Sequence, residues 1–129
     1  MSEITVNMKN KTGFVALKGA DEEAVKLAEQ TLGVRFADEY RQYVLACGAA
    51  SFEGHELTGV CHIPRLNVVD VTEEERNFVE NIPKDWYVIE QTHMDGIVFW
   101  QAHGGEIYSS SPERKPQRVF DSLHDYIES

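Results

Sequence analysis

The chain has 129 residues, of which 42% are hydrophobic and 26% charged, and its 12 lysine and arginine residues against 22 aspartate and glutamate residues give a net charge of −10. This length and hydrophobicity predict one ordered domain with a buried core, and the negative charge excludes nucleic acids and anionic membranes as expected partners. Residues 1–20 contain one acidic residue and three lysines, a net charge of +2, which leaves −12 on residues 21–129.

The first half of the chain predicts an N-terminal strand or hairpin followed by two helices. Weak alternation of apolar residues over 3–18 favours the strand or hairpin, which forms an extension over residues 1–20. Between Asp21 and Gly33, apolar residues recur at helical spacing after an acidic start. A second helix is predicted to begin at Asp38, which can cap it. One face of that helix is apolar and contains Tyr40, Tyr43, Val44 and Cys47.

The middle of the chain predicts a loop, a strand and a third helix. Residues 48–59 contain three glycines and little periodicity, which is typical of a loop. The apolar, β-branched run Leu66–Val71 favours a buried strand. Thr72 with Glu75 three residues later has the spacing of a capping box, so a helix is expected to begin at Thr72 and to run towards Pro83.

The last third of the chain predicts an antiparallel meander and a terminal helix. Three β-branched and aromatic runs are separated by Asp95-Gly96 and Gly104-Gly105; they are Trp86–Gln91, Ile97–Ala102 and Glu106–Ser110. A loop over Ser111–Pro116 and a helix capped by Ser122 complete the chain. We therefore expect a single α+β domain in which an antiparallel sheet packs with an N-terminal helix pair, a middle helix and a C-terminal helix.

The cysteines and histidines form no recognised metal motif. Cys47 and Cys61 match neither a disulfide framework nor a zinc knuckle, so both are expected to be reduced and partly buried. His55, Cys61 and His62 lie close together but lack the paired short spacings of a zinc site, and His55 opens a zincin-like motif whose second histidine is replaced by glycine. His93 and His103 flank a predicted strand and are expected to face solvent. We expect no metal or cofactor.

Candidate catalytic residues are limited to carboxylates. The sequence contains no nucleophile elbow, phosphate-binding loop or dinucleotide fingerprint. Asp70 with Glu73–Glu75, and Glu90 with Asp95, are pairs of the residue type that a glycosidase uses as acid and base. Such pairs also arise by chance in a chain with 22 acidic residues. A small carboxylate-dependent hydrolase is therefore a less favoured function than the two protein-binding functions described below.

Three segments together resemble the SUKH superfamily. The first contains an acidic residue, Leu-Gly and a tyrosine followed by an apolar residue, and the other two match the middle and end of the family's order of elements. The segments are Glu29–Val44, Val68–Arg76, and Ile82–Asp85 together with Phe120–Leu123. The resemblance covers about residues 21–128. It departs from the family at Phe36-Ala37, where Leu-Pro is usual, and Asp38 can start the helix there instead.

The resemblance implies a non-enzymatic α+β domain. Bacterial members of the family are regarded as immunity proteins that bind and neutralise toxin domains, often nucleases, and fungal members are regulators linked to cell-wall synthesis and signalling. An acidic body would attract a nuclease whose active site is basic. An immunity protein is therefore the leading hypothesis, and an intracellular scaffold or regulator is the alternative.

We expect a cytoplasmic protein with a protein partner, either monomeric or a weak homodimer. No apolar run is long enough to span a membrane, and the first residues lack the features of a secretion signal. If one of Trp86 and Tyr87 faces out of its strand beside Asp85, it would be a candidate hot spot. The candidate partner-binding residues bracket the third helix and the start of the meander: Asp70, Glu73, Glu74, Asp85, Trp86 and Glu90.

Overall fold

The computed structural model describes residues 3–129, which form five α-helices, one 3₁₀-helix (η1) and seven strands. The elements in chain order are α1 (Glu3–Lys9), β1 (Val15–Ala16), α2 (Glu22–Leu32), α3 (Asp38–Cys47), β2 (Ala50–Phe52), β3 (His55–Glu56), η1 (Pro64–Leu66), α4 (Val68–Phe78), β4 (Tyr87–Gln91), β5 (Val98–Gln101), β6 (Ile107–Ser111), β7 (Arg114–Phe120) and α5 (Leu123–Glu128). This is the α+β architecture expected from the sequence. None of the described helices has the length and apolar character needed to cross a bilayer.

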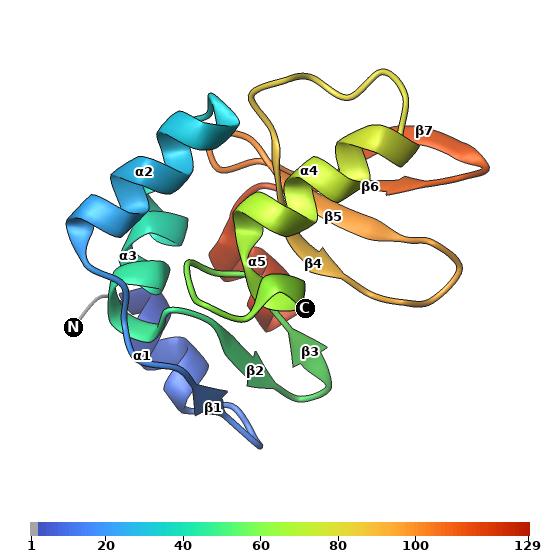
Figure 1. Ribbon diagram of the computed structural model, residues 1–129. Helices are drawn as coiled ribbons and strands as arrows, with labels where there is room; N and C mark the ends of the chain where they lie inside the picture. Colours follow the sequence, from blue (N-terminus) through green and yellow to red (C-terminus); the bar gives the residue numbers. More distant parts are fainter. Residues whose placement is uncertain (1–2) are drawn as a thin grey trace.

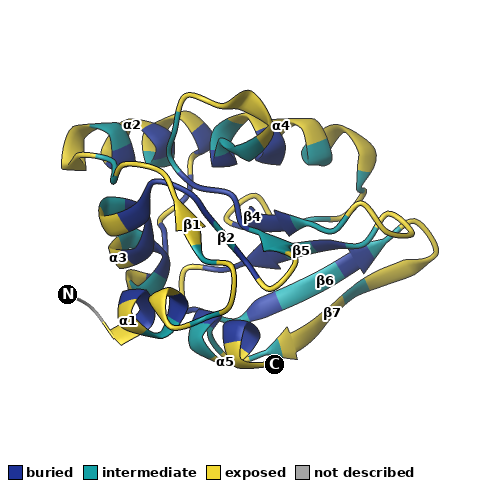
Figure 2. Ribbon diagram, turned by 90° about the horizontal axis from the view of Figure 1, so that it is seen from below, coloured by how far each residue is buried: buried dark blue, intermediate teal, exposed yellow. Residues whose placement is uncertain are grey.

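The strands form two antiparallel sheets between helical layers (Figures 1 and 2). Strands β1, β2 and β3 form the smaller sheet, and β4 to β7 form a four-stranded meander in sequential order. Helices α2 and α4 contact each other on one side of the meander, and α5 lies on the opposite side. Both faces of the meander are therefore covered by helices over part of their area.

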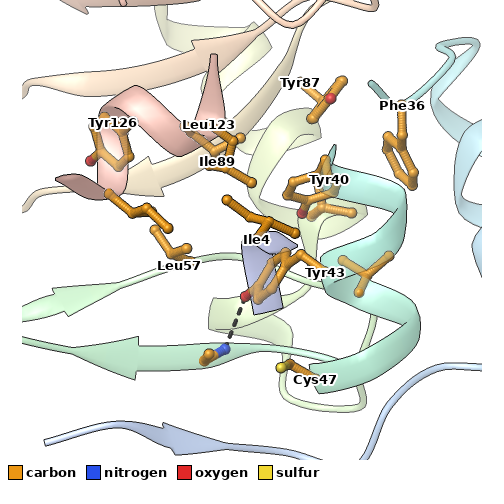
Figure 3. Packing of buried hydrophobic residues seen from close by; sticks show 14 of the residues in the cluster. Ile4, Phe36, Tyr40, Tyr43, Cys47, Leu57, Tyr87, Ile89, Leu123 and Tyr126 are labelled. Atoms are coloured by element: carbon orange, nitrogen blue, oxygen red, sulfur yellow. Dashed lines mark hydrogen bonds between the residues drawn. The ribbon is translucent and has the colours of Figure 1, made fainter. Parts of the chain in front are cut away.

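Each face of the meander belongs to a different hydrophobic cluster. Because successive strand residues point to opposite faces, Tyr87 and Ile89 of β4 enter the main core, whereas Val88 faces α4. The main core is drawn in Figure 3, and α1, α3 and α5 contribute to it. The second cluster lies between the sheet and α4, and consists of Val71, Trp86, Val88, Val98, Trp100 and Ala102.

Helices α2, α3 and α5 form where the sequence predicts them, but the cap residue of α3 differs from the prediction. Asp21 caps α2 by accepting a hydrogen bond from the Ala24 N–H at 2.8 Å, and Gly33 ends the helix in the left-handed region with φ of 70°. Helix α3 covers the predicted residues and buries the predicted face, but Asp38 does not cap it. Ala37 occupies the cap position without a side-chain bond, and Asp38 is the first helical residue. Ser122 caps α5 as expected.

The N-terminal prediction of a strand or hairpin is wrong for the first segment, which is helix α1. Ile4 and Met8 are four residues apart and both are buried, whereas Val6 between them is 44% exposed. Ile4, Val6 and Met8 fit the spacing of a strand, and Ile4 with Met8 also fits the spacing of a helix. The segment forms a helix, and in this form α1 packs on α3 and α5. Among residues 3–20, which the structure describes, only Val15–Ala16 (β1) form a strand.

The predicted loop over residues 48–59 instead contains the β2–β3 hairpin. Its turn residues Glu53 and Gly54 both have positive φ, at 48° and 84°, which matches the geometry of tight hairpin turns. Strand β1 pairs with β2 to complete the small sheet. The missing alternation in the sequence reflects the shortness of these strands, which span three and two residues.

The predicted strand Leu66–Val71 and capping box at Thr72 are also wrong. A 3₁₀ turn ends at Leu66, and α4 begins at Val68 with Asn67 as its cap, so Thr72 lies inside the helix. Val68, Val71 and Thr72 have helical spacing and are buried. Tertiary burial of this stripe outweighs the strand preference of the β-branched residues.

The three meander runs are strands as predicted, but the following loop ends earlier. Strand β7 begins at Arg114 and includes Pro116, which the prediction placed in the loop. β7 is the edge strand of the meander, so the missing N–H of Pro116 need not interrupt a ladder on its free side. The pairing with β6 is irregular between Ser109 and Ser111.

Candidate protein-binding surface

The outward side of α4 carries an acidic stripe. Asn67 starts the helix by accepting a hydrogen bond from the Val69 N–H at 2.9 Å. With Val68 and Val71 buried beneath, residues at i, i+3 and i+4 on the other side face solvent. They are the α4 acidic face, which consists of Asp70, Glu73 and Glu74.

The charges of the α4 acidic face are available to a partner. All three carboxylates are exposed, and none forms an ion pair or side-chain hydrogen bond with another described residue. Asp70 is one turn from both Glu73 and Glu74, and like charges at this spacing repel each other by a few tenths of a kcal/mol per pair. A basic partner would relieve that repulsion and is steered towards such a surface.

Asp85 is exposed as well, but it belongs to a different part of the surface. It lines a hollow of about 670 Å³ beside the end of α2, together with Lys26, Arg35 and His103. Glu29 and Arg41 line the same hollow, and none of its lining residues is part of the α4 acidic face. The structure therefore separates Asp85 from the acidic residues with which the sequence grouped it.

Trp86 is not an exposed hot spot, and neither is Tyr87. Trp86 is only 9% exposed and stacks on Tyr108, with ring centroids 4.0 Å apart and planes inclined by 18°. Tyr87 points into the main core, where its hydroxyl donates to Gln101 at 2.8 Å and accepts from the Ala37 N–H at 2.9 Å. Burial raises the pKa of Tyr87 well above its usual value. Neither residue faces out, because Tyr87 lies in the main core and Trp86 packs in the cluster between the sheet and α4.

Glu90 is a buried carboxylate at the junction of β3, β4 and α5 and is unavailable to a partner. It is 4% exposed. One carboxylate oxygen accepts a short hydrogen bond from the Tyr126 hydroxyl and lies 2.9 Å from His55 Nδ1, and the other accepts from the Glu56 N–H at 2.9 Å. Burial, followed by the charge of Glu90, raises the pKa of Tyr126. These contacts tie the hairpin, the sheet and the last helix together.

The histidines and cysteines of the sequence do not converge. His55 contacts Glu90, whereas the Cys61 thiol faces the Ile63 carbonyl at 3.7 Å. No group of three or more His, Cys, Asp or Glu residues among those described is arranged to hold a metal ion. His93 and His103 are exposed, as expected. Cys47 is buried, and burial raises the pKa of its thiol.

A groove at the end of α4 was not anticipated from the sequence. It has a volume of about 1050 Å³ and lies between the end of α4, the following loop, the β4–β5 turn and the β6–β7 hairpin. Its lining includes Phe78, Pro83, Trp86, Ile97 and Pro112. We call it the α4–hairpin groove. No signal in the sequence marks this groove, because its walls come from segments far apart in the chain.

Comparison with known proteins places the whole chain in one family. The model of the family SUKH_5, described as SMI1-KNR4 cell-wall, matches residues 1–129. The match therefore includes residues 1–20, which the sequence pattern predicts to be an extension. No curated protein matches the chain.

Proposed function

The chain belongs to the SUKH_5 family, the SMI1-KNR4 cell-wall family, and on that premise we propose that it is a non-enzymatic immunity protein that binds and neutralises a toxin domain. The observation that carries the proposal is the α4 acidic face, with three exposed carboxylates that are unpaired among the described residues. The toxin would be a basic protein such as a nuclease, because an active site that holds phosphate is itself positively charged.

Electrostatic attraction gives the proposed mechanism its first step. The net charge of −10 draws a basic domain towards the protein, and the α4 acidic face orients it. Inhibition then follows because the bound protein covers the toxin's basic site. Such steering raises association rates by roughly 10- to 1000-fold and weakens as salt is added.

The neighbouring genes provide the test of the proposed function. Each neighbouring gene product would be expressed alone and with this protein, and growth and co-purification would be recorded at low and high salt. We expect one product to be toxic alone, and to be captured and silenced by this protein. If no neighbouring product is toxic or captured, the immunity function is wrong, and a regulatory partner sought by affinity capture from lysate becomes the better explanation.

The position of the interface is tested separately, by reversing two charges. Glu73→Lys with Glu74→Lys is expected to slow association with the captured toxin by about tenfold or more at low salt. The matched control is Glu22→Lys with Glu23→Lys, which makes the same change in net charge at two exposed positions of α2. Equal rates for the two double variants would show that α4 is not the interface, even where the toxin is silenced.

A further inference from the structure

Phe78 lies at the edge of the inward stripe of α4 but is not covered. Val71, Glu75 and Phe78 follow one another at i, i+4 and i+7, which places them on one side of the helix. Val71 is buried against the sheet, and Glu75 accepts a hydrogen bond from Gln91 Nε2 at 2.7 Å. Phe78, one turn further, lines the α4–hairpin groove and is 76% exposed. The helix thus overhangs a groove that the chain itself does not fill.

The two sides of this groove carry opposite charges. Glu80 lines the side that follows α4, and Arg114 and Lys115 line the β6–β7 hairpin on the other side. None of the three forms an ion pair or a side-chain hydrogen bond with another described residue. Glu113 also lines the hairpin side and partly offsets its positive charge. The groove therefore keeps opposite charges apart within one molecule.

We propose that the α4–hairpin groove is a homodimer interface, in which Phe78 of each copy enters the groove of the other. A twofold interface is self-complementary, because each residue meets the same partner residue in both directions. The groove meets this condition, since it presents both an exposed aromatic side chain and a hollow whose lining includes apolar residues such as Val79, Ile97 and Pro112. Its negative side, at Glu80, would face the positive side of the second copy, at Arg114 and Lys115.

The negative net charge of each copy causes a long-range repulsion between the two copies, and salt weakens that repulsion. At physiological ionic strength charges are screened beyond about 8 Å, whereas pairs in direct contact are screened much less. The proposal does not rest on the proposed toxin-binding function, because its experiments use this chain alone. Phe78 is four residues beyond Glu74 and therefore lies between the inward stripe and the α4 acidic face.

The first experiment measures the mass of the full chain in solution by analytical ultracentrifugation over a range of concentrations. We expect the mass to rise from 14.7 kDa towards twice that value. Phe78→Ser should weaken self-association by about tenfold or more, as expected for an aromatic hot spot. Leu27→Ser is the matched control, because Leu27 is also on a helix and 63% exposed but lies outside the groove. A mass that stays monomeric, or equal effects of the two variants, would overturn the proposal.

The second experiment tests the pairing of charges. Glu80→Lys makes both sides of the groove positive, and Arg114→Glu with Lys115→Glu makes both sides negative. Each variant alone should self-associate about tenfold more weakly than the original chain, because like charges then meet. An equimolar mixture should form the heterodimer, since both contacts are again between opposite charges. A mixture that remains monomeric would reject this geometry, whatever the toxin experiments show.

Discussion

At the scale of single residues, Gly59 is the position where a side chain is least tolerated. The Gly59 backbone pairs with η1 and α4, receiving a hydrogen bond from the Val68 N–H at 2.7 Å. A Cβ atom at Gly59 would lie 1.6 Å from the Gly48 carbonyl oxygen. That oxygen belongs to the main chain, so it cannot move aside as the end of a flexible side chain could. Gly59→Ala is therefore expected to reduce the free energy of unfolding by about 3 kcal/mol or more, measured by chemical denaturation.

Gly54→Ala is the control for Gly59→Ala, because Gly54 has a left-handed backbone conformation but no neighbouring atom that a Cβ would touch. Its φ is 84°, but a Cβ there would meet no atom within 4 Å. The expected loss is about 1 kcal/mol, the usual cost of a left-handed conformation. Equal losses at the two positions would contradict the steric explanation for Gly59.

Single residues also show where sequence reasoning about the site reached its limit. Asp70, Glu73 and Glu74 are exposed, as acidic side chains without partners usually are, and their role in partner binding stays a prediction. Glu90 is the exception, and its partners His55 and Tyr126 come from distant segments. Nothing near Glu90 in the sequence distinguishes it from the carboxylates that are exposed.

At the scale of elements, the start of α4 depends on Asn67. Its side chain accepts from the Val69 N–H and donates to the Cys61 carbonyl, both at 2.9 Å. Asn67→Ala is expected to reduce the free energy of unfolding by about 1 to 2 kcal/mol, as is usual for loss of a helix cap. Asn67→Asp keeps the accepting oxygen and loses only the donor, so a smaller loss is expected. If Asn67→Ala and Asn67→Asp reduced the free energy of unfolding equally, in thermal or chemical denaturation, capping would not be the role of Asn67.

Elements with their own end signals were predictable from the sequence, and the others were not. Helices α2 and α5 each carry a capping side chain of their own, Asp21 and Ser122, and their spacing is unambiguous. Helix α1 and the start of α4 have apolar patterns that fit either helix or strand. Their outcome depends on what covers them, because isolated segments of this length do not decide between the two.

At the scale of the whole molecule, the meander explains why the exposed face of β4 was not predictable. Strand alternation separates two faces but does not say whether solvent or another layer meets each face. Helix α4 covers one face and the main core the other, so Trp86 and Tyr87 are both buried. The α4–hairpin groove could not be predicted for a similar reason, since its walls meet only in the folded chain.

The main core contains four buried tyrosines, and their ionisation links the whole fold to pH. Burial is the main reason that the pKa of each is raised, and the charge of Glu90 adds to the effect at Tyr126. In the unfolded chain the pKa of tyrosine is about 10. The four are Tyr40, Tyr43, Tyr87 and Tyr126.

Because the folded pKa values lie above the unfolded value, the unfolded chain loses these protons first as pH rises. The stabilisation is complete below about pH 10 and is lost above it, at about 5 kcal/mol per pH unit when all four tyrosines contribute. We expect cooperative alkaline unfolding in circular dichroism, together with the tyrosinate absorbance of the four buried rings. Tyr126→Phe should reduce the slope of stability against pH by about a quarter. Tyrosinate absorbance from these rings well before the loss of ellipticity would contradict the prediction, because it would mean that they ionise inside the folded core.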